Sequence, residues 1–514
     1  MKTENSNINN RQISINMIAN IVSYSSNLLI SFVLTPFLIN TLGKETYSFY
    51  PVANTIVSYM SVITNSMNTM ASRFVTVSLV KGDKEEANKY YSSVLAANLI
   101  LGLILVIPMI LVVVFLDEFM EIPINSVAAI KALFALVFSS TLVNILGSTF
   151  GIATFAKNRI DLRSLRELVT ALLRLILFVL LYKFLPASIV YVGFVTLLVA
   201  LVNVAFQFQY TRLLLPEIHI SKANISISHT RELFSTSVWN MINTLGNTLL
   251  AGMTLILANV FYGATVSGTY SIVQTVPQFI SGTIVMLVGV FYPAITYRFA
   301  ENDIEGLLLE VNRAQKAIGA VACTTIVVFS ALASEFFALW TPGEDSTYLS
   351  ILSFVTILPH ICIACLWSLT NLNVVMNKVK IPALFTMGMG LANVLIAYVI
   401  HKIAAPGLLS VPIISSLLQV VWIAGFIPQY ACKNLKVKWN TFYEPLVRAV
   451  CCTIPVGAFV ILFKNLFVLD SWLKFILFGG CMGCIGLTVF GIGMIGLNNI
   501  KIYAQKVFNK IRKK

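Results

Sequence analysis

Residues 31–75 read SFVLTPFLINTLGKETYSFYPVANTIVSYMSVITNSMNTMASRFV and contain most of two long apolar stretches that meet at a short turn around Gly43. Each stretch is long enough to cross a bilayer as a helix, which takes about 20 residues. Polar side chains recur in the second stretch at helical spacing and on one face, at Asn54, Ser58, Ser61, Asn65, Asn68 and Ser72. The segment therefore predicts two membrane-spanning helices, the second with a polar stripe.

The rest of the chain continues in the same way. Of its 514 residues, 58% are hydrophobic and only 11% are charged, against about 25% charged in an ordinary soluble domain. Apolar stretches cover approximately residues 13–40, 46–72, 91–116, 127–155, 166–184, 186–208, 233–260, 265–297, 317–340, 349–376, 381–401, 405–429, 447–467 and 472–497. This excludes a water-soluble fold and leaves no room for a separate soluble domain. We predict an all-α polytopic membrane protein with about 14 transmembrane helices.

Lysine and arginine gather in alternate loops. With a cytoplasmic N-terminus, 28 of the 35 cationic side chains fall on the cytoplasmic side, the positive-inside bias of helical membrane proteins. We therefore expect a multi-pass membrane protein with both termini in the cytoplasm. The net charge of +14 follows from this topology, and no nucleic-acid partner is expected.

The polar residues repeat at an offset of 220 positions. Asn16, Asn20 and Asn27 correspond to Thr236, Asn240 and Asn247, and the stripe from Asn54 corresponds to Gln274, Gln278 and Ser281. The same offset pairs Gly43 with Gly263 and Asp83 with Asp303. Six helices followed by six similar helices form a parallel internal repeat. The last two helices lie outside it.

This repeat gives the expected domain organisation. The chain would consist of a cytoplasmic tail (1–12), an N-lobe of helices 1–6 (13–208), an inter-lobe linker (209–232), a C-lobe of helices 7–12 (233–429), a cytoplasmic loop (430–446), helices 13 and 14 (447–497) and a basic amphipathic tail (498–514). The tail carries its apolar residues on one face and is expected either to lie on the anionic inner leaflet or to be frayed.

Polar side chains in lipid must face protein or a water-filled cavity. Two six-helix bundles would enclose such a cavity, and the polar stripes are its expected lining: Asn16, Asn20, Asn27, Asn54, Asn65, Asn68, Asn240, Asn243, Asn247, Gln274 and Gln278. The alternative is that these residues only join helices through hydrogen bonds.

Three arginines lie on one face of the fifth helix, at positions 163, 166 and 174, with Glu167 between them. Arg174 would lie about 16 Å along the helix, where an unpaired arginine costs about 2.5–3.5 kcal/mol. An ion pair with Glu167, an anion-attracting cavity or snorkelling could offset this cost. We expect Arg73, Arg163, Arg166 and Arg174 to contact an anionic substrate.

Acidic residues avoid the middle of every apolar stretch, where a proton- or sodium-coupled drug antiporter usually needs a carboxylate. The pairs Cys362/Cys365 and Cys481/Cys484 lie in uncharged stretches and are expected to pack as small residues rather than bind zinc. We therefore expect no catalytic residue, no metal and no cofactor, and a transporter rather than an enzyme.

Residues 31–75 resemble the first two helices of the oligosaccharide flippases, a branch of the multidrug/oligosaccharidyl-lipid/polysaccharide (MOP) exporter superfamily. The matching elements are Pro36, the LINTLG turn ending at Gly43, the aromatic start of the second helix at Tyr47 and Tyr50, and the NTMASRF segment at its end. A looser match extends over about residues 13–430. Fourteen helices, where this branch commonly has twelve, leave the related peptidoglycan-precursor flippases open.

The resemblance implies a V-shaped pair of bundles in the bacterial cytoplasmic membrane that flips undecaprenyl-diphosphate-linked oligosaccharides by alternating access, for synthesis of O antigen, capsule or exopolysaccharide. Membrane lipids and the glycosyltransferases and polymerase of such a system would be its partners. A cation-coupled multidrug exporter is the alternative within the superfamily. A membrane-embedded polymerase or ligase would be expected to have a larger outer loop than this chain offers.

Overall fold

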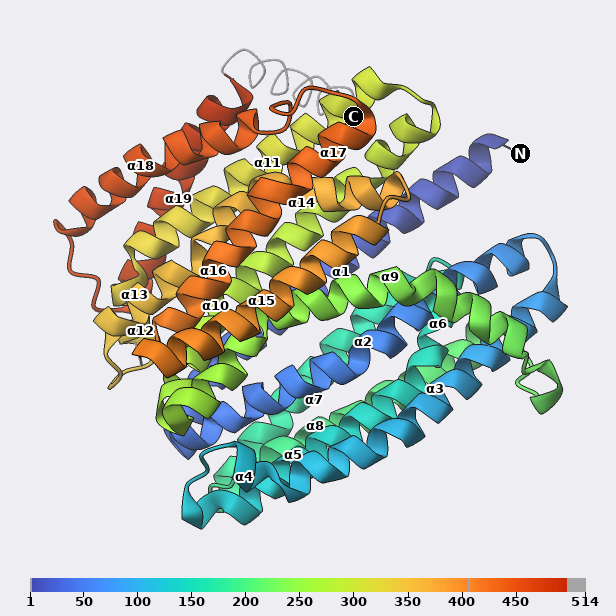
Figure 1. Cartoon of the computed structure of the whole chain (residues 1–514), viewed down its shortest axis with the longest axis horizontal. Coiled ribbons are helices and arrows are strands. Elements are labelled where there is room, and N and C mark those ends of the chain that lie inside the picture. Colours follow the sequence, from blue (N-terminus) through green and yellow to red (C-terminus); the bar gives the residue numbers. More distant parts are fainter. Residues whose placement is uncertain (1, 405–406, 497–514) are drawn as a thin grey trace. The chain divides into compact units, whose positions relative to one another are not determined.

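The computed structural model describes residues 2–404 and 407–496, and no strand occurs in these ranges (Figure 1). The first part contains α1 (Lys2–Leu42), α2 (Lys44–Val80), α3 (Lys84–Val114), α4 (Leu116–Phe119), α5 (Val127–Gly147), α6 (Ile152–Ala156), α7 (Ile160–Phe184), α8 (Val190–Leu214) and α9 (Ile227–Ala251). The second part contains α10 (Met253–Ala300), α11 (Ile304–Ala331), α12 (Ala333–Trp340), α13 (Ser346–Ile357), α14 (Pro359–Val375), α15 (Lys380–Ala404), α16 (Ser410–Val420), α17 (Ile427–Leu435), α18 (Glu444–Lys464) and α19 (Trp472–Ile495). The expected basic tail, 498–514, lies outside the described residues.

Within the described residues, eleven helical segments are long and apolar enough to cross a membrane. One of these segments, Ile227–Ala300, covers two of the predicted stretches. The two predicted stretches that are not among the eleven correspond to α2 and α7, which carry the polar stripe and the arginines. The protein is thus an all-α polytopic membrane protein with eleven candidate spans, by length and composition, in the part of the chain that the structure describes. The number of about 14 stays a prediction.

Lipid-facing surface is visible along α3. Its exposed side chains are large and apolar, among them Leu103, Ile104 and Ile107, whereas Asn98 on the same helix is fully buried. A helix in water would show the reverse arrangement. This pattern is what a bilayer requires, because polar groups there must find partners inside the protein.

The chain forms two compact units, Met1–Thr248 with Leu255–Gly268, and Leu249–Thr254 with Thr269–Lys514. In the first unit, α2, α3, α5 and α8 pack as consecutive neighbours (Figure 1). Met67, Ala71 and Val75 of α2 are buried against Tyr91 and Val94 of α3. The predicted linker 209–232 belongs to this unit, as does most of α9.

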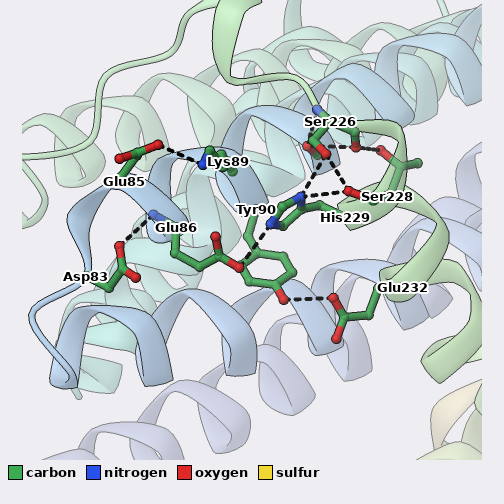
Figure 2. A network of polar contacts seen from close by, with 11 residues as sticks. Asp83, Glu85, Glu86, Lys89, Tyr90, Ser226, Ser228, His229 and Glu232 are labelled. Carbon is green, nitrogen blue, oxygen red and sulfur yellow. Dashed lines mark hydrogen bonds and ion pairs between the residues drawn. The ribbon is translucent and has the colours of Figure 1, made fainter.

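The linker is attached to the start of α3 by a set of polar contacts that we call the latch (Figure 2). His229 Nε2 lies 3.0 Å from Glu86 Oε1, and the hydroxyl of Tyr90 donates to Glu232 Oε2 at 2.8 Å. The Ser226 backbone N–H donates to Ser93 Oγ at 3.0 Å. The latch holds the beginning of α9 against α3 within the first unit.

In the second unit, α11 is the central helix and packs against α14, α18 and α19. The Lys464 ammonium at the end of α18 donates to the backbone oxygen of Ala331 at 2.9 Å and to Glu335 Oε1 at 3.0 Å. At Gly319 of α11 a Cβ atom would lie 2.7 Å from Met494 Cε of α19. The last two helices therefore pack tightly on the second unit.

Candidate functional site

Two adjoining pockets lie inside the first unit. The larger, of about 680 Å³, is lined by α2, α5, α6, α7 and α8 and by the single turn Ser148–Gly151. The smaller, of about 250 Å³, lies between α1, α5, α7 and α8. Asn144 and Arg166 line both pockets and so mark their junction.

The arginines of α7 converge on these pockets. Arg163 and Arg166 line the larger pocket, and Arg166 and Arg174 line the smaller one. The Arg166 side chain is 9% exposed and that of Arg163 is 62% exposed. The Nε atoms of Arg166 and Arg174 are buried and have no hydrogen-bond partner within the described part of the chain. These two guanidinium groups thus retain donors for a further acceptor.

Glu167 is the carboxylate of the smaller pocket. Its Oε1 accepts a hydrogen bond from Arg163 Nε at 2.9 Å and lies 3.8 Å from an amino nitrogen of Arg166. Glu167 pairs with Arg163 and Arg166, and no direct ion pair within 4 Å joins it to Arg174 among residues 2–404 and 407–496. Glu167 follows Arg163 by four residues and therefore pairs with it on one helix face, about two turns before Arg174.

The pockets carry a net positive charge. Three arginines and one carboxylate line them, which leaves an excess of two positive charges among the described lining residues. Charges in a site with little water interact more strongly than they do in bulk solvent. An anion with two charges would balance this excess, whereas a cation would be repelled.

The side of the larger pocket that α2 forms is uncharged and polar. Asn65 and Asn68 of α2 line it, as the stripe predicted for that helix. Asn68 Nδ2 donates to Ser148 Oγ at 2.7 Å, and buried Asn98 donates to Asn68 Oδ1 at 3.0 Å. Asn98 also donates to Thr149 Oγ1 at 2.9 Å. The wall is thus fixed by a network that joins three segments of the chain.

Three amide side chains that line the pockets were missed from the sequence: Asn144 of α5, and Asn203 and Gln207 of α8. Asn203 and Gln207 are four residues apart and therefore share one helix face. Asn203 Nδ2 lies 3.5 Å from Asn144 Oδ1. This i, i+4 spacing of amides is the signal that could have identified Asn203 and Gln207, whereas Asn144 has no amide four residues away on α5.

Of the other predicted residues on α1 and α2, some line a pocket and some have different contacts. Asn27 lines the smaller pocket. Asn16 is buried, donates to Asn158 Oδ1 at 3.0 Å and accepts from the backbone N–H of Asp161 at 3.0 Å. It therefore positions the start of α7. Exposed Arg73 and Asn20 and half-buried Asn54 line neither pocket.

The predicted residues of α9 and α10 are also outside the pockets. Asn240 Nδ2 donates to Ser66 Oγ at 3.3 Å within the first unit. Asn243 and Asn247 are half-buried on the same helix. Gln274 and Gln278 lie in the second unit. The site is thus built from helices of the first unit alone, and no group of three metal-ligating side chains occurs among the described residues.

The fold is that of the MOP superfamily, whose members are membrane transporters and not enzymes. A multidrug resistance MATE family transporter of this superfamily in an inward-facing conformation matches with a TM-score of 0.68 at 14% identity, over 82% of this chain and 98% of that chain. The lipid II flippase MurJ in an inward closed conformation matches with a TM-score of 0.65 at 14% identity, over 93% of this chain and 98% of that chain. Such low identities show the fold alone.

Residues 13–298 match the polysaccharide biosynthesis protein family, and the chain belongs to this family. A curated relative, the uncharacterized membrane protein EpsK of Bacillus subtilis (strain 168), is 25% identical in an alignment of 464 residues that covers 89% of this chain and 91% of the relative. The resemblance seen in residues 31–75 to this superfamily is confirmed.

Proposed function

We propose that this protein flips oligosaccharides linked to undecaprenyl diphosphate across the bacterial cytoplasmic membrane, for synthesis of a surface polysaccharide such as O antigen, capsule or exopolysaccharide. The observation that carries the proposal is the group of arginines in the two pockets, where Arg166 and Arg174 keep buried donors without an acceptor among the described residues. Membership of the polysaccharide biosynthesis protein family supports the substrate class.

The two pockets suit the two parts of such a substrate. Guanidinium groups bind phosphate oxygens through paired hydrogen bonds, so the arginines would hold the diphosphate. The amides and hydroxyls of the larger pocket would face the sugars, and its volume of about 680 Å³ lies in the usual range of about 300–1,000 Å³ for ligand sites. The polyprenyl chain would stay in lipid while the cavity opens alternately to each side.

The topology belongs to the same proposal. Both termini would lie in the cytoplasm, and the two repeats would be the lobes that move during alternating access. The membrane lipids, and the glycosyltransferases and polymerase of the polysaccharide assembly system, would be its partners.

A lipid-linked peptidoglycan precursor is a second candidate substrate. The favouring observation is that the match to the lipid II flippase extends over 93% of this chain, whereas the match to the MATE transporter extends over 82%. Both candidate substrates carry a lipid diphosphate. The cation-coupled multidrug exporter is disfavoured, because Glu167 is already paired with Arg163 in a pocket of net positive charge.

The proposal is tested by polysaccharide export in a strain that lacks this gene and is complemented with variants. Arg174→Gln should lower export about tenfold or more, since a hydrogen bond to a charged group contributes about 1.5–3 kcal/mol. Arg313→Gln is the matched control, because Arg313 is an exposed arginine paired with Glu310 in the second unit. Normal export by Arg166→Gln and Arg174→Gln at equal membrane levels would contradict the proposal. Loss of viability, with peptidoglycan precursor accumulation, would instead indicate the second substrate.

A further inference from the structure

Glu167 is the one acidic residue among the described side chains that line the two pockets. A carboxylate in an anion site weakens the site, because it repels the ligand and occupies the cations that would bind it. A pocket that served only to bind an anion tightly would not contain Glu167. The contacts of Glu167 indicate a different role for this side chain.

The two carboxylate oxygens of Glu167 face different elements. Oε1 accepts from Arg163 Nε at 2.9 Å and lies 3.8 Å from Arg166. Oε2 accepts from the hydroxyl of Ser23 in α1 at 3.3 Å. Ser23 itself is 1% exposed, and α1 packs along α7. One side chain thus connects the arginines of the pocket with the neighbouring helix.

The contact with Arg163 is easily exchanged. Arg163 is 62% exposed and precedes Glu167 by four residues on the same helix, and exposed pairs of this kind are among the weakest ion pairs. At 3.8 Å, the contact with Arg166 is longer than a hydrogen bond. A ligand with more charge and more acceptor oxygens would therefore compete well for both guanidinium groups.

We infer that Glu167 binds the arginines of the pocket in place of the anionic group of the substrate while the pocket is empty. A diphosphate that enters the junction binds Arg163 and Arg166 and displaces the Glu167 carboxylate. The displaced carboxylate then loses its hydrogen bond with Ser23. Occupancy of the pocket is then communicated to α1, and lipids without a second negative charge do not complete the exchange. The inference rests on the proposed function, because it requires that the pocket binds a diphosphate.

The experiment measures binding of inorganic pyrophosphate to the purified full-length protein by isothermal titration calorimetry. Glu167→Gln keeps the size of the side chain and can still bond Ser23, but it loses the charge that competes with the ligand. Its pyrophosphate affinity should rise about fivefold or more, in keeping with the loss of one like charge from a partly buried site. A purely structural role for Glu167 would not raise affinity.

Two further variants make the result specific. Glu310→Gln is the matched control, because Glu310 pairs with Arg313 on α11 at 2.7 Å and lines neither pocket; its affinity should equal that of the wild type. Glu167→Asp keeps the charge on a shorter side chain and should give an intermediate affinity, which provides a second test if the glutamine variant does not fold.

The outcomes separate the inference from the proposed function. If the wild type binds pyrophosphate and Arg174→Gln does not, equal or weaker binding by Glu167→Gln overturns the inference alone. If Arg174→Gln binds as the wild type does, or if neither the wild type nor Glu167→Gln binds, both are overturned. The same titration with farnesyl diphosphate distinguishes the source of the anion. A higher affinity of Glu167→Gln for this lipid supports a lipid-borne diphosphate. A higher affinity of Glu167→Gln for pyrophosphate alone supports the exchange at Glu167 but contradicts the proposed function.

Discussion

Asp83 and Asp303, which are 220 positions apart, begin α3 and α11 in the same way. Asp83 accepts a hydrogen bond from the backbone N–H of Glu86 at 2.9 Å, and Asp303 accepts one from Gly306 at 2.8 Å. Their φ and ψ angles are −84° and 84° for Asp83 and −81° and 82° for Asp303. The preceding residue has positive φ in both cases. The two halves of the chain thus repeat one backbone turn.

We predict that Asp83→Ala lowers the free energy of unfolding by about 1 kcal/mol, the usual cost of losing an N-cap side chain. Asp83→Asn should be close to the wild type, because the amide oxygen still accepts from Glu86. Thermal unfolding of the detergent-purified protein measures both. Equal destabilisation by alanine and asparagine would show that the cap does not contribute.

Local features of the sequence predicted much of the fold. The apolar stretches, the repeated turn and the polar stripe of α2 depend on near neighbours in the chain, so they can be read without tertiary structure. Gly43 and Gly263 have φ angles of 78° and 86°, which a side chain rarely adopts. The pairing of these glycines in the repeat was therefore a sound indication of matching backbone.

The pocket was harder to predict, because its walls come from helices distant in sequence. The arginines of α7 were identified from their spacing, but Asn144 and Gln207 lie on helices that are mostly apolar and carry only scattered polar residues. Asn16 shares the spacing of a cavity stripe, yet its partners are 142 and 145 positions away at the start of α7. Helical periodicity predicts on which face of its helix a residue lies, but not which other element packs against that face.

The contact between α5 and α8 beside the pocket gives a second prediction. A Cβ atom on Gly147 would lie 2.6 Å from Val204 Cγ1, so Gly147→Ala should destabilise the protein by about 1–3 kcal/mol, as overpacking does. Val204→Ala in the same chain removes the clashing methyl groups and should restore most of the loss. A double-mutant cycle of unfolding temperatures measures the coupling. Additive effects of the two substitutions would contradict this contact.

A third prediction concerns pH and the carboxylate at the start of α7. The hydrogen bonds from Arg159 hold the pKa of Asp161 below its usual value. The folded state therefore gains stability from this group above the pKa of the unfolded chain, about 3.9, and loses it as the pH falls through the lower folded value. The wild type should be more stable than Asp161→Asn at pH 6, and the difference should shrink below about pH 4. A difference in unfolding temperature that is constant with pH would contradict it.

The latch between the linker and α3 gives the last prediction. His229 contributes both a polar contact with Glu86 at 3.0 Å and an edge contact with the ring of Tyr90 at 4.6 Å between centroids. His229→Ala should let the linker open more often, so trypsin should cut after exposed Lys222 about fivefold faster, as expected when about 1 kcal/mol of local stability is lost. His219→Ala is the matched control, because His219 contacts Asn88 through its backbone N–H at 2.6 Å and keeps that bond. Mass spectrometry of the fragments measures the cleavage rates. Equal rates in the two variants would show that the latch does not restrain the linker.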